Sequence, residues 1–297
     1  MVATRRVNED GVVSQARSVF VDHSPPLINC RELNKSYSVR VGEPVVALKN
    51  LNIQVPTSDF VVVVGPSGCG KTTFLRLLAG LETKTTGAIE LGGIPIVGPR
   101  KDIGIVFQSP TLLAWRSVIK NIMLPIDVLG LSRSAHLGRA EQLIEMVGLR
   151  GFEDKYPWEL SGGMQQRVAI CRSLIHQPRL LLMDEPFGAL DAFTRESMNI
   201  ELEKIWLTTR QTILLITHSI PEAVFLATRV AVMSSRPGTI ADVVSVELPR
   251  PRTLDMTTLP KFGDHVRHIR NILNQASASP TLATNFETSL NAGVLSG

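Results

Sequence analysis

A glycine-rich stretch from Gly65 to Thr72 carries the residue types that hold phosphate groups. Its sequence, GPSGCGKT, has the spacing G-x-x-x-x-G-K-[ST]. Glycines at these positions let the backbone curl so that successive N–H groups point inward, and a helix starting near Lys71 adds its positive end. Lys71 can then reach the β- and γ-phosphates of a nucleotide, and the Thr72 hydroxyl can ligate Mg²⁺. The predicted phosphate-binding residues are Gly65, Pro66, Ser67, Gly68, Cys69, Gly70, Lys71, Thr72 and Thr73.

A glycine-rich turn with a chance lysine is the alternative interpretation. The stretch follows the apolar run FVVVVG and precedes a helical pattern, which favours nucleotide binding. Cys69 lies inside the stretch as a small space-filling residue, or as a redox-sensitive thiol. The three cysteines are odd in number and widely spaced, which predicts reduced thiols in a cytosolic setting.

A second pair of chemical groups, Asp184 and Glu185, ends the run LLLMDE. An aspartate at the end of a buried strand beside the phosphate loop can hold the Mg²⁺ shell. A glutamate one residue later can take a proton from an attacking water. Glu185 can also be an ordinary loop carboxylate, although Pro186 fixes the chain directly after it. A phosphate loop alone allows kinases, GTPases and many ATPases.

Strands alternating with helices must position these groups, so the fold class is α/β. The apolar runs predict strands at 45–55, 60–65, 103–107, 179–185 and 212–217. The β-branched run 60–65 has no polar break, as expected for a parallel strand buried on both faces. Helical patterns lie between the strands. The expected inner face of 134–148 consists of Leu137, Ala140, Leu143, Ile144 and Val147, and Gly148 is the expected stop.

Two further helix starts are marked by polar residues. A helix is expected from about Ser161 until Pro178, and Ser219 with Glu222 forms a predicted capping box. The segment from about 110 to 160 has helical patterns without a matching strand and is interpreted as an insertion.

The stretch LSGGMQQR, at 160–167, makes the pattern specific. It resembles the signature motif of the ATP-binding-cassette (ABC) ATPases. The family's other motifs appear in the family's order around it. GPSGCGKT and Gln108 after a strand precede the signature, and LLLMDE, GALD at 188–191 and His218 after a strand follow it. The resemblance implies a P-loop core with a RecA-like parallel-sheet subdomain, an antiparallel β subdomain and a helical subdomain at about 110–177. It also implies ATP and Mg²⁺ as ligands.

The signature motif has a physical logic of its own. Ser161 and two glycines open a helix with free N–H groups, which makes a second phosphate site within one chain. By resemblance, two subunits pair head to tail and each ATP lies between the Lys71 loop of one and the Ser161 turn of the other. The residues expected to contact the ATP of the opposite subunit are Ser161, Gly162, Gly163, Gln165 and Asp191. The alternative role for Ser161 and Asp191 is that of a helix N-cap, and for Asp191 both roles can hold.

The remaining roles also follow from the resemblance. Gln108 is expected to touch Mg²⁺ or the attacking water, and His218 to contact the γ-phosphate. Tyr37 is expected to stack on adenine. The alternatives are a polar strand-end residue, a structural histidine and a core tyrosine. The catalytic set is thus Glu185, His218, Gln108 and Lys71, and the Mg²⁺ set is Thr72, Gln108 and Asp184.

The composition of the two ends and the extent of the resemblance together suggest domain boundaries. We expect a flexible arm at 1–26, the ATPase domain at 27–250, a helical extension at 251–275 and a loosely ordered tail at 276–297. No bilayer-spanning run and no signal peptide is expected from the charge-interrupted sequence.

Three stretches, at 107–125, 184–195 and 248–273, resemble ATPase subunits of bacterial importers for nitrate, sulfonates and taurine. That branch implies a peripheral subunit on the cytoplasmic face of the inner membrane. Its expected partners are a second ATPase subunit (an identical copy or a relative), integral-membrane permease subunits and a solute-binding protein. Residues 112–118 would receive the permease, with Trp115 either in that contact or in the core.

Two functions of other classes remain as alternatives. A soluble ABC ATPase acting on nucleic acid or ribosomes would usually carry two cassettes, coiled-coil insertions or zinc motifs, which this sequence lacks. A small-metabolite kinase would leave LSGGMQQR unexplained. The net charge of +4 is not concentrated in a basic stripe, so no nucleic-acid partner is expected.

Overall fold

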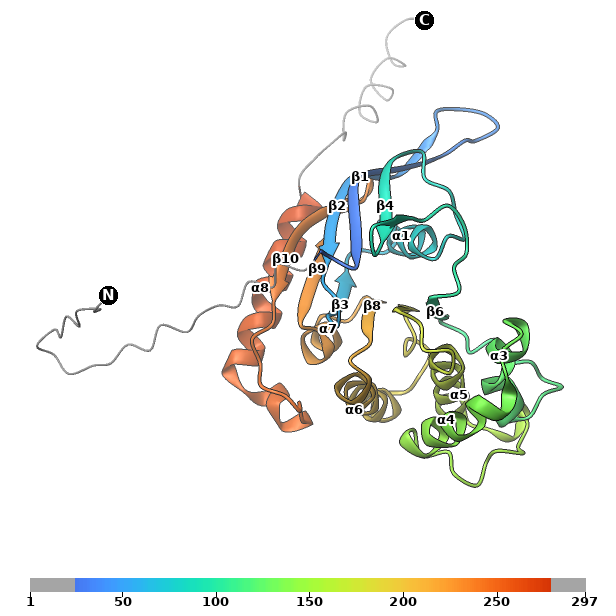
Figure 1. Cartoon of the computed structure of the whole chain (residues 1–297). Helices are drawn as coiled ribbons and strands as arrows, with labels where there is room; N and C mark the ends of the chain where they lie inside the picture. The colour runs from blue at the N-terminus through green and yellow to red at the C-terminus, as the bar shows by residue number, and fades with distance from the viewer. Residues whose placement is uncertain (1–24, 279–297) are drawn as a thin grey trace, which may run out of the picture.

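A computed structural model describes residues 25–278 (Figure 1). The arm expected at 1–26 and the tail expected at 276–297 lie almost wholly outside these residues. The strands are β1 Ile28–Tyr37, β2 Val45–Val55, β3 Phe60–Val64, β4 Thr86–Leu91, β5 Ile94–Pro95, β6 Ile103–Val106, β7 Leu180–Asp184, β8 Thr212–Thr217, β9 Arg229–Met233 and β10 Ile240–Ser245. The α-helices are α1 Lys71–Leu78, α2 Val118–Ile122, α3 Leu124–Val128, α4 Arg133–Met146, α5 Gly162–Leu174, α6 Ala192–Thr209, α7 Ile220–Leu226 and α8 Pro260–Ala278.

The larger sheet has the order β10-β9-β3-β8-β7-β6 and is parallel except for the edge strand β10. Residues of β3 and β8 are buried on both faces, which explains why they read as unbroken apolar runs. Strands β3, β6, β7 and β8 run in one direction, so their carboxyl ends share one edge of the sheet. The segments that carry Lys71, Gln108, Glu185 and His218 therefore begin at the same edge.

A second, antiparallel sheet has the order β2-β1-β4-β5 and covers one face of the parallel sheet together with α1. The other face packs against helices that include α5, α6, α7 and α8. The large sheet is thus enclosed between two apolar cores. Helices α3, α4 and α5 gather at one end of the molecule, away from the antiparallel sheet (Figure 1). This mixed α/β architecture confirms the predicted fold class.

All five strand regions expected from apolar runs are present as β2, β3, β6, β7 and β8. Strands β1, β4, β5, β9 and β10 were not expected. Polar residues interrupt β1 and β4, β5 has two residues, and β9 is an apolar run as long as β3 that was missed. Helix α4 ends at Met146, and Gly148, with a φ of 67°, stops it as predicted. The inner face of α4 was partly wrong, since Leu137 is 46% exposed whereas Ala140, Leu143, Ile144 and Val147 are buried.

The structure also bears on Trp115 and on the end of the C-terminal helical extension. Trp115 is 74% exposed, so its core alternative is wrong. Helix α8 extends to Ala278, beyond the boundary expected at 275. Within residues 25–278 none of the helices combines the length and the low charge needed to cross a bilayer.

Candidate functional site

The phosphate loop connects β3 to α1 and bends where only glycine fits. Gly68 and Gly70 have φ values of 75° and 107°, which side chains rarely tolerate. A Cβ on Gly70 would also lie 2.9 Å from the carbonyl oxygen of Ala47. The Lys71 side chain is buried, and its Nζ donates to the carbonyls of Gly65 and Pro66 at 2.8 and 2.9 Å. The ammonium is therefore held beside the loop's first residues.

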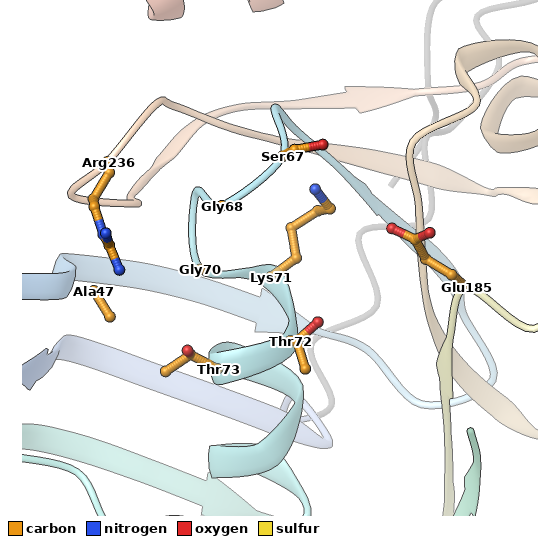
Figure 2. Close-up of a pocket in the computed structure, with 9 residues that line it drawn as sticks. All are labelled: Ala47, Ser67, Gly68, Gly70, Lys71, Thr72, Thr73, Glu185 and Arg236. Atoms are coloured by element: carbon orange, nitrogen blue, oxygen red, sulfur yellow. The ribbon is translucent and has the colours of Figure 1, made fainter. Parts of the chain in front are cut away.

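A cavity of about 290 Å³ opens over this loop (Figure 2). Its lining residues are Ala47, Ser67, Gly68, Gly70, Lys71, Thr72, Thr73, Glu185 and Arg236. Six of these come from the predicted phosphate loop and one is the predicted base. Ala47 and Arg236 were not predicted, because neither belongs to a motif.

Thr72, which lines the cavity, contacts Asp184 at the end of β7, where Thr72 Oγ1 donates to Asp184 Oδ1 at 3.3 Å. Burial raises the pKa of Asp184, and the Thr72 hydrogen bond only partly offsets this. A hydroxyl and a partly desolvated carboxylate are the hard oxygen ligands that Mg²⁺ takes up together with substrate phosphates. The two residues therefore fit the predicted metal.

Glu185 has a φ of 43°, a backbone conformation that is uncommon outside glycine. Its N–H donates to the carbonyl of Ile216 on β8, and its own carbonyl accepts from Gly188. The bend turns the side chain off the strand direction, and in Figure 2 its carboxylate points toward Lys71. His218 Nδ1 lies 3.1 Å from Glu185 Oε2. The predicted base and the predicted histidine are thus direct neighbours.

Gln108 follows β6 and approaches the same carboxylate. A Cβ on Gly188 would lie 3.6 Å from both Gln108 Nε2 and Glu185 Oε2. The two side chains therefore lie close to one point above Gly188. Gln166 of α5 donates to the carbonyl of Phe107 at 3.3 Å, so the signature helix contacts the segment that carries Gln108.

The predicted capping box at the start of α7 is only half present. Ser219 Oγ accepts from the N–H of Glu222 at 3.3 Å, as expected. Glu222 does not return a bond to the Ser219 N–H. Thr217 stands between them, because its hydroxyl donates to Glu222 Oε2 and accepts from the Ser219 N–H at 3.1 Å. This relay fixes the backbone on both sides of His218.

Tyr37 lies at the end of β1, where its hydroxyl is 3.5 Å from Thr73 Oγ1. Lys35 Nζ stands 4.6 Å from the ring centroid. The ring is only partly buried, which argues against the core alternative. Thr73 also lines the cavity, so Tyr37 stands next to the phosphate loop through this contact.

The signature residues do not line the Lys71 cavity. Ser161 is exposed and N-caps α5, where its side chain accepts from the N–H of Met164. A Cβ on Gly163 would meet Thr194 at 2.8 Å, so the signature turn packs against the start of α6. Gln165 Nε2 donates to the carbonyls of Pro157 and Leu160. The turn is thus not part of this chain's own Lys71 cavity, and Gly162 is exposed beside Ser161.

Asp191 N-caps α6 and accepts from the Thr194 N–H at 3.0 Å and from the Thr194 hydroxyl at 2.6 Å. These bonds lower the pKa of Asp191. The carboxylate is exposed, so the capping role leaves it accessible to another molecule.

Cys69 is 1% exposed and burial raises the pKa of its thiol, which favours its space-filling role.

Comparison with known proteins agrees with this geometry. Residues 48–188 match the family model described as ABC transporter. An uncharacterised ABC transporter ATP-binding protein of Methanocaldococcus jannaschii is 48% identical over 78% of this chain and 86% of that protein. The nitrate import ATP-binding protein NrtD of Synechocystis sp. PCC 6803 is 44% identical over 85% of this chain and 97% of its own length. The taurine import ATP-binding protein TauB of Escherichia coli K12 is 44% identical over 74% of this chain and 85% of its own.

A solved structure is similar as well. The dimeric ATP-binding cassette MJ0796, bound to ADP and phosphate after hydrolysis, superposes with a TM-score of 0.65 at 29% identity, covering 75% of this chain and 100% of that one. These similarities extend well beyond the phosphate loop and include both sheets and the helical region. The chain belongs to the ATP-binding subunits of ABC transporters.

Proposed function

We propose that the chain is the ATP-hydrolysing subunit of a bacterial importer for a small anionic solute such as nitrate, a sulfonate or taurine. The observation that carries this proposal is the 44% identity to NrtD over 97% of that protein's length. Similarity of this extent includes the helical region through which such a subunit would contact its transporter, as well as the ATPase core.

The proposed chemistry is in-line attack of water on the γ-phosphate of ATP. Glu185 takes the water's proton while the new P–O bond forms and the bond to the β–γ bridging oxygen breaks, leaving ADP and phosphate. His218, 3.1 Å from Glu185, holds that carboxylate in place. Lys71 exchanges its loop carbonyl partners for phosphate oxygens and stabilises the charge that develops.

Thr72 and Asp184 would hold Mg²⁺, with Gln108 approaching from β6. The metal, when bound, would neutralise charge on the β- and γ-phosphates. Asp184 is suited to this role because burial disfavours its negatively charged form, and a bound cation would offset that cost. Gln108 lies beside Glu185 above Gly188 and can orient the water toward that base.

The second half of each site would come from another ABC ATPase subunit, either a second copy or a relative. Ser161, Gly162, Gly163 and Gln165 lie at one exposed turn beside α6, and Asp191 caps that helix. Because this turn does not reach the Lys71 cavity of its own chain, its free N–H groups suit the γ-phosphate of a partner's ATP. The dimeric cassette MJ0796 supports such pairing.

The proposed permease contact is the loop 112–118. Trp115 is exposed on this loop, and the loop is held rigid by the buried Asn121. The Asn121 amide accepts from the Leu113 N–H at 2.8 Å and donates to the carbonyls of Leu113 and Arg116. An exposed indole on a fixed loop is the kind of anchor that protein interfaces use.

The two residues just before this loop are hydrogen-bonded to the helix that begins at the signature turn. Arg172 of α5 donates to the carbonyls of Pro110 and Thr111 at 2.8 and 2.9 Å. Helix α5 begins at the signature turn, so one rigid helix joins the proposed permease contact to the proposed partner-ATP contact. Movement of the turn on ATP binding would therefore move the permease loop.

We expect the subunit to lie on the cytoplasmic face of the inner membrane, bound to permease subunits that receive solute from a solute-binding protein. The relatives named as import proteins favour transport over the soluble alternative that acts on nucleic acid or ribosomes.

The test is co-purification of tagged Glu185→Gln protein from solubilised membranes with ATP and Mg²⁺, followed by mass spectrometry. We expect a multi-spanning permease to be captured. Recovery of ribosomes, nucleic acid or soluble proteins alone would contradict the transport proposal while leaving the ATPase chemistry intact.

A matched pair of tryptophan variants locates the contact. Trp115→Ala in the same background should lose the permease. Trp158→Ala removes another exposed indole of the helical region, stacked on Tyr156 with ring centroids 4.7 Å apart, and should retain it. Equal retention in both variants would show that loop 112–118 is not the contact.

A further inference from the structure

Arg236 lines the Lys71 cavity but belongs to none of the sequence motifs described above. It lies in the β9–β10 loop, residues 234–239, and lines the cavity together with Ala47 and the phosphate loop. Figure 2 shows its side chain extending toward Ala47, on the opposite side of the phosphate loop from Glu185. Lys71 stands between these two residues in that view. Arg236 is therefore remote from the position of the proposed γ-phosphate chemistry.

The loop that carries Arg236 is hydrogen-bonded to β2 and packs against the phosphate loop. The Gly238 N–H donates to the carbonyl of Ala47 at 2.9 Å, and the Lys49 N–H donates to the carbonyl of Gly238 at 3.0 Å. Gly238 also packs on the phosphate loop so closely that a Cβ there would lie 2.1 Å from the Cys69 carbonyl oxygen. The loop thus presents Arg236 from a fixed backbone.

The same loop is braced internally. Ser234 and Thr239 exchange bonds, since the Ser234 N–H donates to the Thr239 carbonyl at 3.0 Å and Ser234 Oγ accepts from the Thr239 N–H at 3.1 Å. A fixed backbone reduces the entropy lost when a side chain at its tip engages a ligand.

The charge of Arg236 is uncompensated by carboxylates within residues 25–278, because none of the ion pairs found there includes it. A guanidinium has a planar fork of donors that matches phosphate oxygens, and it cannot lose its proton near neutral pH. The residues near Arg236 indicate that it lies toward the nucleoside end of the bound nucleotide. Ala47 is on β2, which pairs with the strand carrying Tyr37, and Thr73 contacts Tyr37.

We propose that Arg236 binds the part of the nucleotide that ATP and ADP share, namely the α-phosphate and the adjoining ribose. This inference rests on the proposed placement of ATP in the Lys71 cavity and adds a residue to it. Binding that is equal for ATP and ADP stabilises substrate and product alike, so it lowers KM and slows ADP release without accelerating the chemical step. Arg236 is thus a binding residue rather than a catalytic one.

The test is the affinity of the full chain for ADP, measured by isothermal titration calorimetry in low salt with Mg²⁺. ADP is the better probe because it does not require a partner's signature turn. Arg236→Ala should weaken ADP binding about tenfold, the range of a charge-assisted hydrogen bond at a partly exposed site. ATP binding, measured in the Glu185→Gln background, should weaken by the same factor. Arg236→Lys should be intermediate, since it keeps the charge and loses the fork.

The control is Arg270→Ala, which removes an equal charge from the exposed side of α8 and should leave ADP affinity unchanged. Equal ADP affinity in the Arg236→Ala and wild-type proteins, with an unchanged melting temperature, would overturn the inference. Weakening of ATP alone would also overturn it, because it would place the guanidinium on the γ-phosphate.

The wild-type protein and Lys71→Ala separate this inference from the proposed function. If wild-type protein binds ADP and Lys71→Ala does not, the cavity assignment holds whatever Arg236 does. If wild-type protein does not bind ADP, the cavity assignment fails and takes the Arg236 inference with it.

Discussion

Arg252 joins the segment after β10 to helix α7, and its removal should destabilise the protein strongly. The side chain is 3% exposed. Its Nη1 donates to the carbonyls of Val224, Phe225 and Ala227 at 2.8 to 2.9 Å. These oxygens lie at the end of α7, where helical partners run out. Burial lowers the pKa of Arg252 to about 10, so the side chain still carries its charge at pH 7.

The expected magnitude follows from these bonds. In Arg252→Leu the three carbonyls lose a charged donor, and each charge-assisted bond contributes about 1.5–3 kcal/mol. One donor group shared among three acceptors contributes less than three separate bonds. Removing a buried charge also returns part of its desolvation cost. A net loss of about 3 kcal/mol in the free energy of unfolding is therefore expected, which corresponds to a fall of roughly 6–12 °C in melting temperature.

The assay is thermal unfolding followed by circular dichroism, checked by urea denaturation. Arg267→Leu is the matched control, because Arg267 lies on the exposed side of α8 and Asp264 is its one ion-pair partner among the described residues. We expect that variant to stay within about 0.5 kcal/mol of wild type. If Arg252→Leu melts together with Arg267→Leu, the carbonyls at the end of α7 do not depend on Arg252 and the argument is refuted.

Three further predictions concern single carboxylates. Glu185→Gln should reduce kcat for ATP hydrolysis about 10²- to 10⁴-fold while leaving ADP affinity unchanged, as measured by phosphate release and calorimetry; near-normal turnover would remove Glu185 as the base. Burial raises the pKa of Glu222, so the folded protein holds this proton more tightly than the unfolded chain does. The protonated Glu222 side chain therefore contributes its full stabilisation below pH 4.5, and this contribution is lost as the pH rises. Glu222→Gln should accordingly gain stability relative to wild type on going from pH 4.5 to pH 8 in thermal melts, and a pH-independent difference would contradict this. Asp191→Ala should lower the midpoint of urea denaturation because α6 loses its N-cap, whereas Asp191→Asn should keep most of the wild-type midpoint.

Several features followed from the sequence alone because their causes are local. The phosphate loop needs glycines at fixed spacing between a strand and a helix, and 65–72 provides them. The central strands β3, β7 and β8 are buried on both faces, so they appear as unbroken apolar runs. The signature motif identified the family, and the helix-capping positions of Ser161 and Asp191 follow from the preference of these residue types for N-caps.

Other features of the site were decided only by tertiary structure. The neighbours Gln108 and Glu185 are brought above Gly188 by the order of β6, β7 and β8, which residue spacing does not encode. Half of the predicted capping box is replaced by contacts of Thr217. Its hydroxyl, and not the Ser219 N–H, donates to Glu222 Oε2, and the Ser219 N–H donates to the Thr217 hydroxyl instead. Neither contact belongs to a sequence motif, so neither was predictable from residue types and spacing.

Arg236 illustrates the physical reason most directly. It is 171 residues away from Gly65 in the chain, and no local pattern distinguishes it from other surface arginines. It lines the cavity only because β9 pairs in parallel with β3 and because Gly238 fits between β2 and the phosphate loop. Local chemistry determined what the phosphate loop can bind, whereas long-range packing decided which distant side chains share its cavity.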